Sequence, residues 1–380
     1  MMNPIRVLIV DDSAAVRRTL RALISEDPEL EVAGVAANGR IALAMLEQSV
    51  PDLITLDLEM PEMDGLAVLE HLRNNYPRLP VIIFSSTTER GAAVTLEALS
   101  RGATDYVTKP SGLFGPGEAL HSIREQLLPS IKTLCTRRNH LCLPTCLREP
   151  NTVRVDHGSR VEVVAIGTST GGPNALAEAL AALPPDLPVP VLVVQHMPPR
   201  FTRFLAERLS TVCALPVREA QGGERLLPGT VWIAPGGFHL AVVRRARAAH
   251  LRGLATPPEN SCRPSVDVLF RSLAESFGSG VLAIVMTGMG QDGLRGARDI
   301  SDAGGRVWAQ DAGTSVVWGM PGFVVESGLA ERVLPLPLIG PEIVRTVGES
   351  RRLGSLPTWA LERSHEYIEC DLRVSGATGL

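Results

Sequence analysis

The chain has 380 residues, of which 45% are hydrophobic and 21% charged, and its formal net charge is −4. This length is enough for two or three domains with cores of their own, and the composition is that of an ordinary globular protein. A slightly acidic chain without a basic patch lacks the electrostatic footprint of a nucleic-acid-binding protein, so we expect no nucleic-acid partner.

The sequence also carries no sign of export or of membrane insertion. Its start, MMNPIRVLIVDD, lacks the charged n-region and long apolar h-region of a signal peptide. No apolar stretch approaches the length of about 18 residues that a membrane helix needs. The six cysteines are scattered along the chain, which favours reduced thiols. We therefore expect a cytoplasmic protein, with a monomer as the default oligomeric state.

Residues 3–128 alternate five short apolar runs with helical patterns such as AAVRRTLRALISE and LAVLEHLRNN. This alternation predicts a doubly wound parallel sheet, whose ligands bind at the carboxyl ends of the strands. Polar residues that end four of these runs are Asp11 and Asp12 after IRVLIV, Asp57 after DLITL, Ser85 after VIIF, and Lys109 after DYVT.

The three carboxylates are expected to crowd into one crevice. Two like charges about 4 Å apart repel by roughly 4 kcal/mol at an effective dielectric near 20. Such a cluster predicts a bound cation, and carboxylate oxygens are the ligands that suit Mg²⁺.

The character of the chain changes between residues 129 and 158. This segment has no sustained period and is rich in Arg, Cys and Pro, which predicts an interdomain linker whose start continues the preceding helix. Cys135, His140, Cys142 and Cys146 lie in it, but they do not have the paired C-x₂₋₄-C spacing of the usual zinc modules. We interpret them as ordinary thiols rather than as a metal site.

A second alternation of apolar runs and helical patterns spans residues 159–350. It predicts another α/β domain, with strands in VEVVAIG, PVLVVQH, TVWIAP, GVLAIVM and GRVWAQD. The expected architecture is thus two doubly wound parallel-sheet domains, the first flavodoxin-like and the second Rossmann-like. Residues 351–380, from Arg351 onwards, have no clear periodicity and predict a loosely ordered tail.

Three polar motifs follow predicted strands of the second domain. They are GTSTGG at residues 167–172, QHMP with His196, and TGMGQDG with Asp292. A hydroxyl, an imidazole and a carboxylate are the parts of a Ser-His-Asp hydrolase. Neither composition nor spacing chooses among the hydroxyls of GTSTGG as the nucleophile, which leaves Thr168, Ser169 and Thr170.

Each motif alone has a simpler interpretation. A glycine-rich turn can hold a nucleotide phosphate, although this one lacks the GxGxxG spacing and the P-loop lysine. A histidine at a strand end is often a structural hydrogen-bonding group, and Asp292 could be a turn residue. The three motifs together favour hydrolytic chemistry.

With these motifs in view, the chain is similar to a known family. DD at 11–12, DLEMPEMDG at 57–65, Ser85 and YVTKP at 106–110 resemble a response-regulator receiver. GTSTGGP, QHMP, RPSVDVLF, TGMGQDG and AQD resemble the catalytic domain of the chemotaxis protein-glutamate methylesterases. The two domains in this order match that family across residues 3–350, whereas the linker cysteines and the tail have no counterpart in it.

For the first domain the resemblance implies that Asp57 accepts a phosphoryl group from a chemosensory histidine kinase. It implies a Mg²⁺ site formed by Asp11, Asp12 and Asp57, with the backbone carbonyl of Glu59 as a further ligand. It also implies that three residues respond to the phosphoryl group: Ser85 and Lys109, which contact its oxygens, and the aromatic switch residue Tyr106.

For the second domain the resemblance implies Ser169 as nucleophile, His196 as general base, Asp292 as the group that orients it, and the backbone N–H of Met289 as oxyanion donor, with no cofactor. The implied substrates are methyl-accepting chemoreceptors, whose glutamate methyl esters are hydrolysed and whose glutamines are deamidated. The unphosphorylated receiver is implied to cover the esterase site. Two alternatives stay open: the same chemistry in a non-flagellar chemosensory pathway, and a catalytically silent signalling adaptor.

Overall fold

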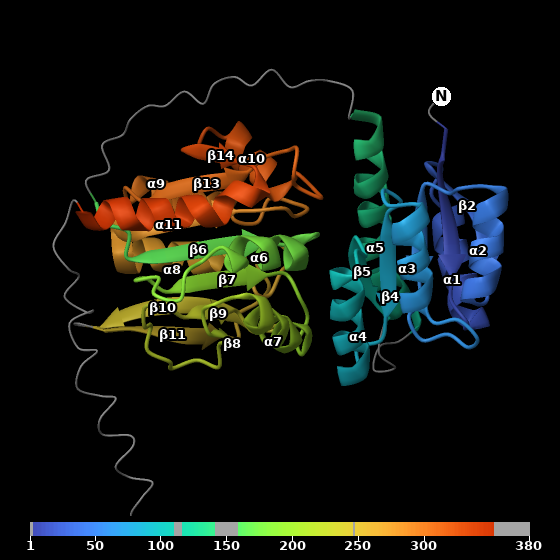
Figure 1. Ribbon diagram of the computed structural model, residues 1–380, viewed down its shortest axis with the longest axis horizontal. Coiled ribbons are helices and arrows are strands. Elements are labelled where there is room, and N and C mark those ends of the chain that lie inside the picture. The colour runs from blue at the N-terminus through green and yellow to red at the C-terminus, as the bar shows by residue number, and fades with distance from the viewer. Residues whose placement is uncertain (1–2, 110–115, 141–158, 246–247, 353–380) are drawn as a thin grey trace, which may run out of the picture.

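The computed structural model describes residues 3–109, 116–140, 159–245 and 248–352, which form two α/β domains (Figure 1). Cys142 and Cys146 of the predicted linker lie outside the described residues, as does the predicted tail from residue 353 onwards. Within the described ranges, none of the helices combines the length and the apolar character needed to cross a membrane.

The first domain has a five-stranded parallel sheet in the order β2-β1-β3-β4-β5, which confirms the predicted flavodoxin-like receiver fold. Its strands are β1 (Ile5–Val10), β2 (Leu30–Ala36), β3 (Leu53–Leu56), β4 (Val81–Ser85) and β5 (Asp105–Thr108). Its helices are α1 (Ala14–Ser25), α2 (Gly39–Gln48), α3 (Gly65–Asn75), α4 (Glu89–Ser100) and α5 (Pro116–His140).

Polar side chains fix where the receiver helices begin. The N-cap residues of α1, α2, α3 and α4 each accept a hydrogen bond from a backbone N–H of the first turn, and they are Ser13, Asn38, Asp64 and Thr88. Such a cap satisfies one of the N–H groups that a helix start leaves without a partner. The loops between strand and cap therefore have defined lengths, and they carry the acidic residues at the carboxyl edge of the sheet.

The second domain has a seven-stranded sheet in the order β14-β13-β12-β6-β7-β9-β8, in which every pairing is parallel. Its strands are β6 (Val163–Thr168), β7 (Val191–Gln195), β8 (Val217–Glu219), β9 (Val231–Ile233), β12 (Val281–Val285), β13 (Arg306–Gln310) and β14 (Arg332–Leu334). The chain starts in the middle of the sheet, runs outward on one side, and returns to the other side at β12. Crevices for ligands form at such a reversal, here between β6 and β12.

Helices cover both faces of this sheet (Figure 1). They are α6 (Gly172–Ala181), α7 (Phe201–Val212), α8 (Val266–Phe277), α9 (Leu294–Asp302), α10 (Met320–Glu326) and α11 (Leu336–Arg352). The five predicted strands are all present. The short strands β8 and β14 were not predicted, nor was the separate antiparallel hairpin of β10 (His239–Arg245) and β11 (Ala248–Leu254).

Two helices extend into segments that the sequence assigned to a linker and to a tail. Helix α5 runs to His140, so the start of the predicted linker continues the last receiver helix. Cys135 on this helix is buried, and its thiol lies 3.8 Å from the backbone carbonyl oxygen of Asp52. Helix α11 ends at Arg352, so the segment predicted as a tail begins within a helix.

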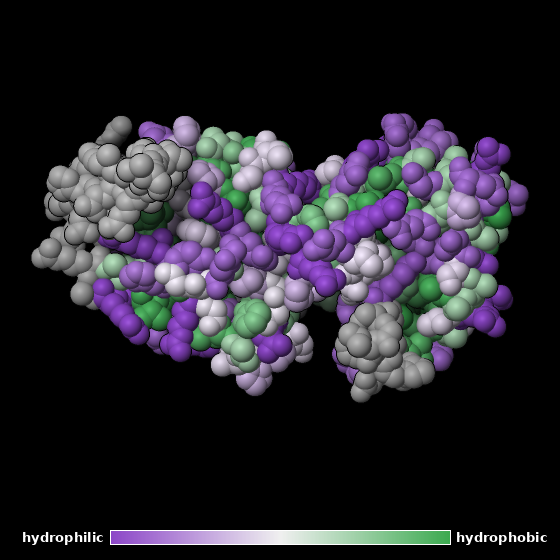
Figure 2. Space-filling view, turned by 90° about the horizontal axis from the view of Figure 1, so that it is seen from below, coloured by the Kyte–Doolittle hydropathy of each residue, from purple (hydrophilic) through white to green (hydrophobic). Residues whose placement is uncertain are grey.

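The two domains meet where α4 and β5 of the receiver face α6 and α7 of the second domain (Figure 1). The ring of Tyr106 stacks on that of Phe201, with centroids 5.1 Å apart and planes inclined by 11°. Polar contacts surround this pair: Asn174 donates to the Leu99 carbonyl (2.7 Å), Arg200 donates to the Thr87 carbonyl (3.0 Å), and Arg203 pairs with Glu89 (3.2 Å). Figure 2 shows two lobes joined at a contact region flanked by hydrophilic side chains.

The burial of two phenylalanines in the second domain predicts how much each contributes to the free energy of unfolding. Phe270 on α8 is fully buried, whereas Phe323 on α10 is 43% exposed. We expect Phe270→Ala to lower the free energy of unfolding by about 3–5 kcal/mol, because it removes buried surface and leaves a cavity. Phe323→Ala, the matched control, should change it by about 0.5 kcal/mol or less.

Urea unfolding followed by tryptophan fluorescence measures this difference, since the described tryptophans, Trp232, Trp308 and Trp318, all lie in the second domain. Equal losses in the two variants would contradict the assignment of Phe270 to the core.

Candidate functional site

Ser169 lies on a tight turn between β6 and α6. Its N–H donates to the Thr287 carbonyl (2.9 Å), and its own carbonyl accepts from the side-chain amide of Gln195 (2.9 Å). Gly171, with a φ of 77°, begins α6 in a left-handed conformation that glycine adopts without strain. A Cβ on Gly288 would lie 2.9 Å from the Cβ of Ser169, so the neighbouring loop approaches this closely only because it carries no side chain there.

The three hydroxyls of the GTSTGG motif point to different surroundings. Thr168 is buried and donates to Gln195 and to the Thr287 carbonyl, both at 3.3 Å. Thr170 donates to the receiver carboxylate of Asp105 at 3.0 Å. The Ser169 hydroxyl makes no hydrogen bond to any described residue, and this residue lines a cavity together with His196.

The imidazole and the carboxylate meet at the carboxyl ends of β7 and β12. Nε2 of His196 lies 2.7 Å from Oδ2 of Asp292, and the two side chains are 12% and 2% exposed. Nδ1 of His196 lies 3.5 Å from Sγ of Cys262, and no hydrogen bond joins it to Ser169 among the described residues. Two of the three predicted triad groups are therefore in contact, and the third lines the same cavity.

Five donors surround the carboxylate of Asp292. Besides Nε2 of His196 they are two backbone N–H groups and two side chains, at 2.7 to 3.2 Å: Val266, Asp267, Ser265 and Asn260. Three of these residues form the start of α8, whose N-terminus favours negative charge. Burial raises the pKa of Asp292, but His196 and the other donors outweigh it and lower the pKa to about 2.

The protonation of His196 follows from its two neighbours. Burial lowers the pKa of His196, but the hydrogen bonds and charges of Asp292 and Cys262 outweigh it and raise the pKa to about 10. The imidazole therefore carries a proton at neutral pH in this arrangement. An imidazolium cannot accept a proton from Ser169, so the arrangement is a resting one as long as Cys262 pairs with Nδ1.

The receiver forms one wall of the cavity in front of Ser169. The cavity has a volume of about 360 Å³ and is lined from both domains, by residues that include Asp105, Tyr106 and Ser130 of the receiver and Ser169, His196, Cys262 and Met289 of the second domain. Thr133 on α5 contacts Sδ of Met289 at 3.6 Å. The backbone N–H of Met289 makes no hydrogen bond to any described residue.

The predicted acidic cluster of the receiver is also assembled. Nζ of Lys109 lies 2.9 Å from Oδ2 of Asp11 and 2.8 Å from Oδ2 of Asp57. Asp12 is exposed beside them, and one carboxylate oxygen from each of the three aspartates lies within 4.8 Å of the others. Burial raises the pKa of Asp57, and the charge of Asp11 adds to this effect while Lys109 opposes it.

These aspartates suit a hard divalent cation. Oδ2 of Asp11 is buried and makes no well-formed hydrogen bond apart from its ion pair with Lys109. A donor set made only of carboxylate oxygens, with excess negative charge, is what Mg²⁺ prefers.

The other predicted switch residues are bonded or packed elsewhere than on the acidic cluster. The Ser85 hydroxyl lies 2.5 Å from that of Thr95 and donates to the Gly91 carbonyl at 3.2 Å, so it is engaged with α4. Tyr106 packs on Phe201, and burial raises the pKa of its hydroxyl well above the usual value. Ser85 still lines a small cavity together with Asp57 and Lys109.

Comparison with known proteins bears on both domains. The family model "CheB methylesterase" matches residues 164–343, and the model "Response regulator receiver domain" matches residues 7–115. A protein-glutamate methylesterase/protein-glutamine glutaminase of Trichodesmium erythraeum is 49% identical over 354 residues, which cover 91% of this chain and 100% of the relative. This chain belongs to that family.

A further relative agrees with this membership, and one solved structure is similar to part of this chain. The family member from a Nocardioides species is 50% identical over 357 residues, covering 92% of this chain and 97% of its own. The crystal structure of the Thermotoga maritima CheB methylesterase catalytic domain is 42% identical, covers 49% of this chain and 98% of its own, and has a TM-score of 0.48.

Sequence reasoning missed the groups that surround Asp292. Ser265 and Asp267 belong to the RPSVDVLF motif, to which the sequence assigned no role beyond its resemblance to the family. Asn260 and Cys262 precede this motif. Asn260 joins two buried carboxylates, since its amide donates to Asp267 and to Asp292, each at 2.8 Å. A serine and an aspartate at a predicted helix start could have indicated these groups, because such residues cap helices or bind polar groups there.

The contact with Cys262 predicts how the titration of His196 responds to a substitution. Cys262→Ser removes the thiol and its negative form, so we expect the pKa of His196 to fall below the value in the parent protein. Histidine-selective NMR titration of the full chain measures this change. Cys213→Ser is the matched control, because Cys213 is buried and its thiol faces the Leu180 carbonyl. An unchanged titration in Cys262→Ser would contradict the proposed effect of the thiol.

Proposed function

We propose that this protein is a phosphorylation-regulated esterase that hydrolyses glutamate methyl esters on methyl-accepting chemoreceptors and deamidates receptor glutamines. The observation that carries the proposal is the contact of His196 with the buried carboxylate of Asp292, together with the cavity that His196 and Ser169 both line. The Ser169 hydroxyl makes no hydrogen bond to any described residue, so it is available in that cavity. Membership of the methylesterase/glutaminase family supports the same chemistry.

Ser169 is the nucleophile in this proposal. Asp292 holds Nε2–H of His196, so the neutral ring offers Nδ1 to the Ser169 proton once Cys262 releases that atom. General-base catalysis of this kind contributes about 10²–10⁴-fold. The attack gives a tetrahedral oxyanion, for which the backbone N–H of Met289 is the proposed donor, a contribution of about 10²–10³-fold.

Collapse of this intermediate expels methanol from an ester, or ammonia from a glutamine side chain. In this collapse His196 acts as general acid, because it donates the proton that it took from Ser169 to the leaving group. Water then hydrolyses the acyl-enzyme by the same route in reverse, which restores Ser169 and leaves a glutamate carboxylate.

Asp57 is the proposed phosphoacceptor, with a chemosensory histidine kinase as phosphodonor. Asp11, Asp12 and Asp57, with the carbonyl of Glu59, would hold Mg²⁺, which offsets the negative charge of the carboxylates and of the phosphoryl group. Lys109 then exchanges its carboxylate partners for phosphoryl oxygens.

Ser85 couples phosphorylation of Asp57 to the position of α4, which borders the cavity. To reach an oxygen on Asp57, its hydroxyl must leave Thr95 and the Gly91 carbonyl, which are both on α4. Helix α4 also carries the Leu99 carbonyl that accepts from Asn174, and the contact between Tyr106 and Phe201 lies beside it. A shift of α4 therefore weakens the contacts that close the cavity.

We expect Ser169→Ala to lower methanol release from methyl-labelled receptor membranes by about 10³-fold or more, because the covalent route is lost. Thr170→Ala is the matched control, since Thr170 carries the adjacent hydroxyl but directs it to the receiver. Its activity should equal or exceed that of the parent. Undiminished methanol release by Ser169→Ala would contradict the nucleophile assignment, and no release by the parent would favour an adaptor.

We expect acetyl phosphate with Mg²⁺ to raise the esterase activity of the full chain, because phosphorylation moves the receiver away from the cavity. Asp57→Asn should not respond, and a protein beginning at residue 155 should be active without a phosphodonor. The same methanol-release assay measures all three. Equal basal activity of the shortened protein and the full chain would contradict occlusion by the receiver.

A further inference from the structure

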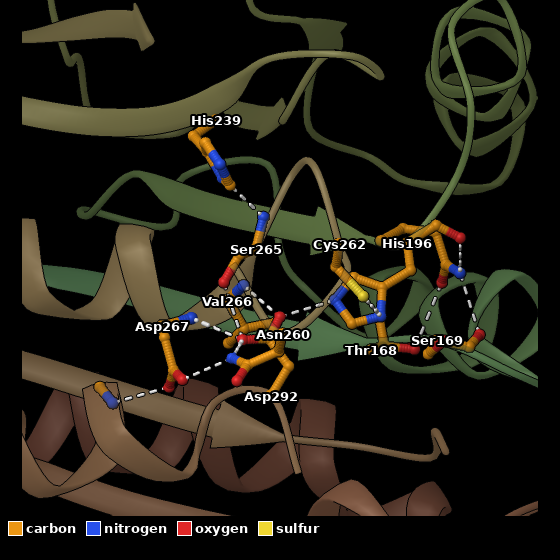
Figure 3. A network of polar contacts seen from close by, with 12 residues as sticks. Thr168, Ser169, His196, His239, Asn260, Cys262, Ser265, Val266, Asp267 and Asp292 are labelled. Carbon is orange, nitrogen blue, oxygen red and sulfur yellow. Dashed lines mark hydrogen bonds and ion pairs between the residues drawn. The ribbon is translucent and has the colours of Figure 1, made fainter. Parts of the chain in front are cut away.

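We propose that Cys262 is a modification site, a thiol that exchanges with low-molecular-weight disulfides and thereby stops ester hydrolysis. Its Sγ lies 3.5 Å from Nδ1 of His196 and faces the same cavity as Ser169 (Figure 3). The residue is partly exposed, unlike the other cysteines whose environment the structure describes, Cys135 and Cys213, which are buried.

The order of contacts around the imidazole is that of an activated thiol. Asp292 binds Nε2, and Cys262 contacts the opposite ring nitrogen, so carboxylate, imidazole and thiol form one chain. An imidazole oriented by a carboxylate is the usual means of converting a thiol into the nucleophilic thiolate. By contrast, the thiols of Cys135 and Cys213 face backbone carbonyl oxygens, which can only accept a hydrogen bond.

The exchange reaction balances with a disulfide as the only added reactant. The Cys262 thiol loses its proton to water, the adjacent imidazolium of His196 stabilises the resulting thiolate, and the thiolate attacks one sulfur of the disulfide RSSR. A new bond forms between Cys262 and that sulfur, the original S–S bond breaks, and the other half leaves as RS⁻. Cys262 is oxidised, one half of the reagent is reduced to the thiol level, and an added thiol reverses the change.

A group attached to Cys262 would block the cavity that the ester substrate enters. Cys262 and Ser169 line the same space of about 360 Å³, so a group attached to Sγ occupies the volume that an ester side chain must enter. The cavity is lined by the cationic Arg263 and by the acidic residues Asp105 and Glu125, so its charge does not select the disulfide, and oxidised glutathione serves as the probe. The consequence for hydrolysis rests on the proposed function, whereas the reactivity of the thiol does not.

The first experiment treats the full-length protein with oxidised glutathione and follows methanol release and intact mass together. Each protein is compared with its own untreated sample. We expect the parent and Cys213→Ser to lose at least about tenfold in activity in step with one glutathione on Cys262, and dithiothreitol to restore it. Cys262→Ser should keep most of its own activity. Loss in Cys262→Ser at the parental rate, or a glutathione on Cys262 without loss of activity, would overturn the proposal.

The second experiment measures the thiol reaction alone, by mass spectrometry of the peptide that carries Cys262. In His196→Gln we expect labelling to be slower by about tenfold or more, because the ring whose positive charge stabilises the thiolate is gone. Asp292→Asn, which preserves side-chain volume, should also slow it. Labelling at the parental rate in both variants would sink the proposal whatever the protein hydrolyses, and tryptophan fluorescence verifies that each variant is folded.

Discussion

The carboxylate of Asp292 is the group on which the catalytic site depends. It is 2% exposed, and a buried carboxylate without partners costs several kcal/mol. Four of its five donors come from residues 260–267, so satisfying this one charge fixes the loop before α8 as well as the imidazole. The same contacts decide that Nε2 of His196 carries a proton toward Asp292, which leaves Nδ1 as the ring nitrogen that faces the cavity.

That single nitrogen has two candidate partners, Ser169 and Cys262. With the thiol in place, the contacts with Asp292 and Cys262 raise the pKa of His196 and leave the serine without a base. The receiver wall acts on the same cavity from outside, through the contacts of Asp105 with Thr170 and of Thr133 with Met289. Two independent arrangements thus stabilise the resting state: His196 is protonated, and the receiver covers the cavity in front of Ser169.

Most of the two sheets was predictable because parallel strands buried on both faces have long apolar runs with polar residues at their ends. The strands β8 (VRE) and β14 (RVL) have three residues each and include charged side chains, whereas the equally short β9 (VWI) is apolar throughout and was predicted. The β10–β11 hairpin is rich in arginine and alanine. The grouping of aspartates with Lys109 followed from the same strand ends. The contact of Cys262 with His196 did not, because it depends on how a loop distant in sequence folds over the site.

The closed arrangement is held by contacts that are individually weak. The Arg203–Glu89 pair is largely exposed, and such pairs contribute about 0–1 kcal/mol, while each interdomain hydrogen bond adds about 0.5–1.5 kcal/mol. Reversing a two-state population from about 1:99 to 99:1 requires roughly 5.5 kcal/mol of differential binding. In the proposed switch, charge-assisted bonds to one phosphoryl group contribute to this difference, as Ser85 gives up its contacts on α4 and Lys109 its ion pairs with two aspartates. An interface that combines the stacked pair of Tyr106 and Phe201 with a few polar contacts suits the proposed control of access to Ser169 by a phosphoryl group on the receiver.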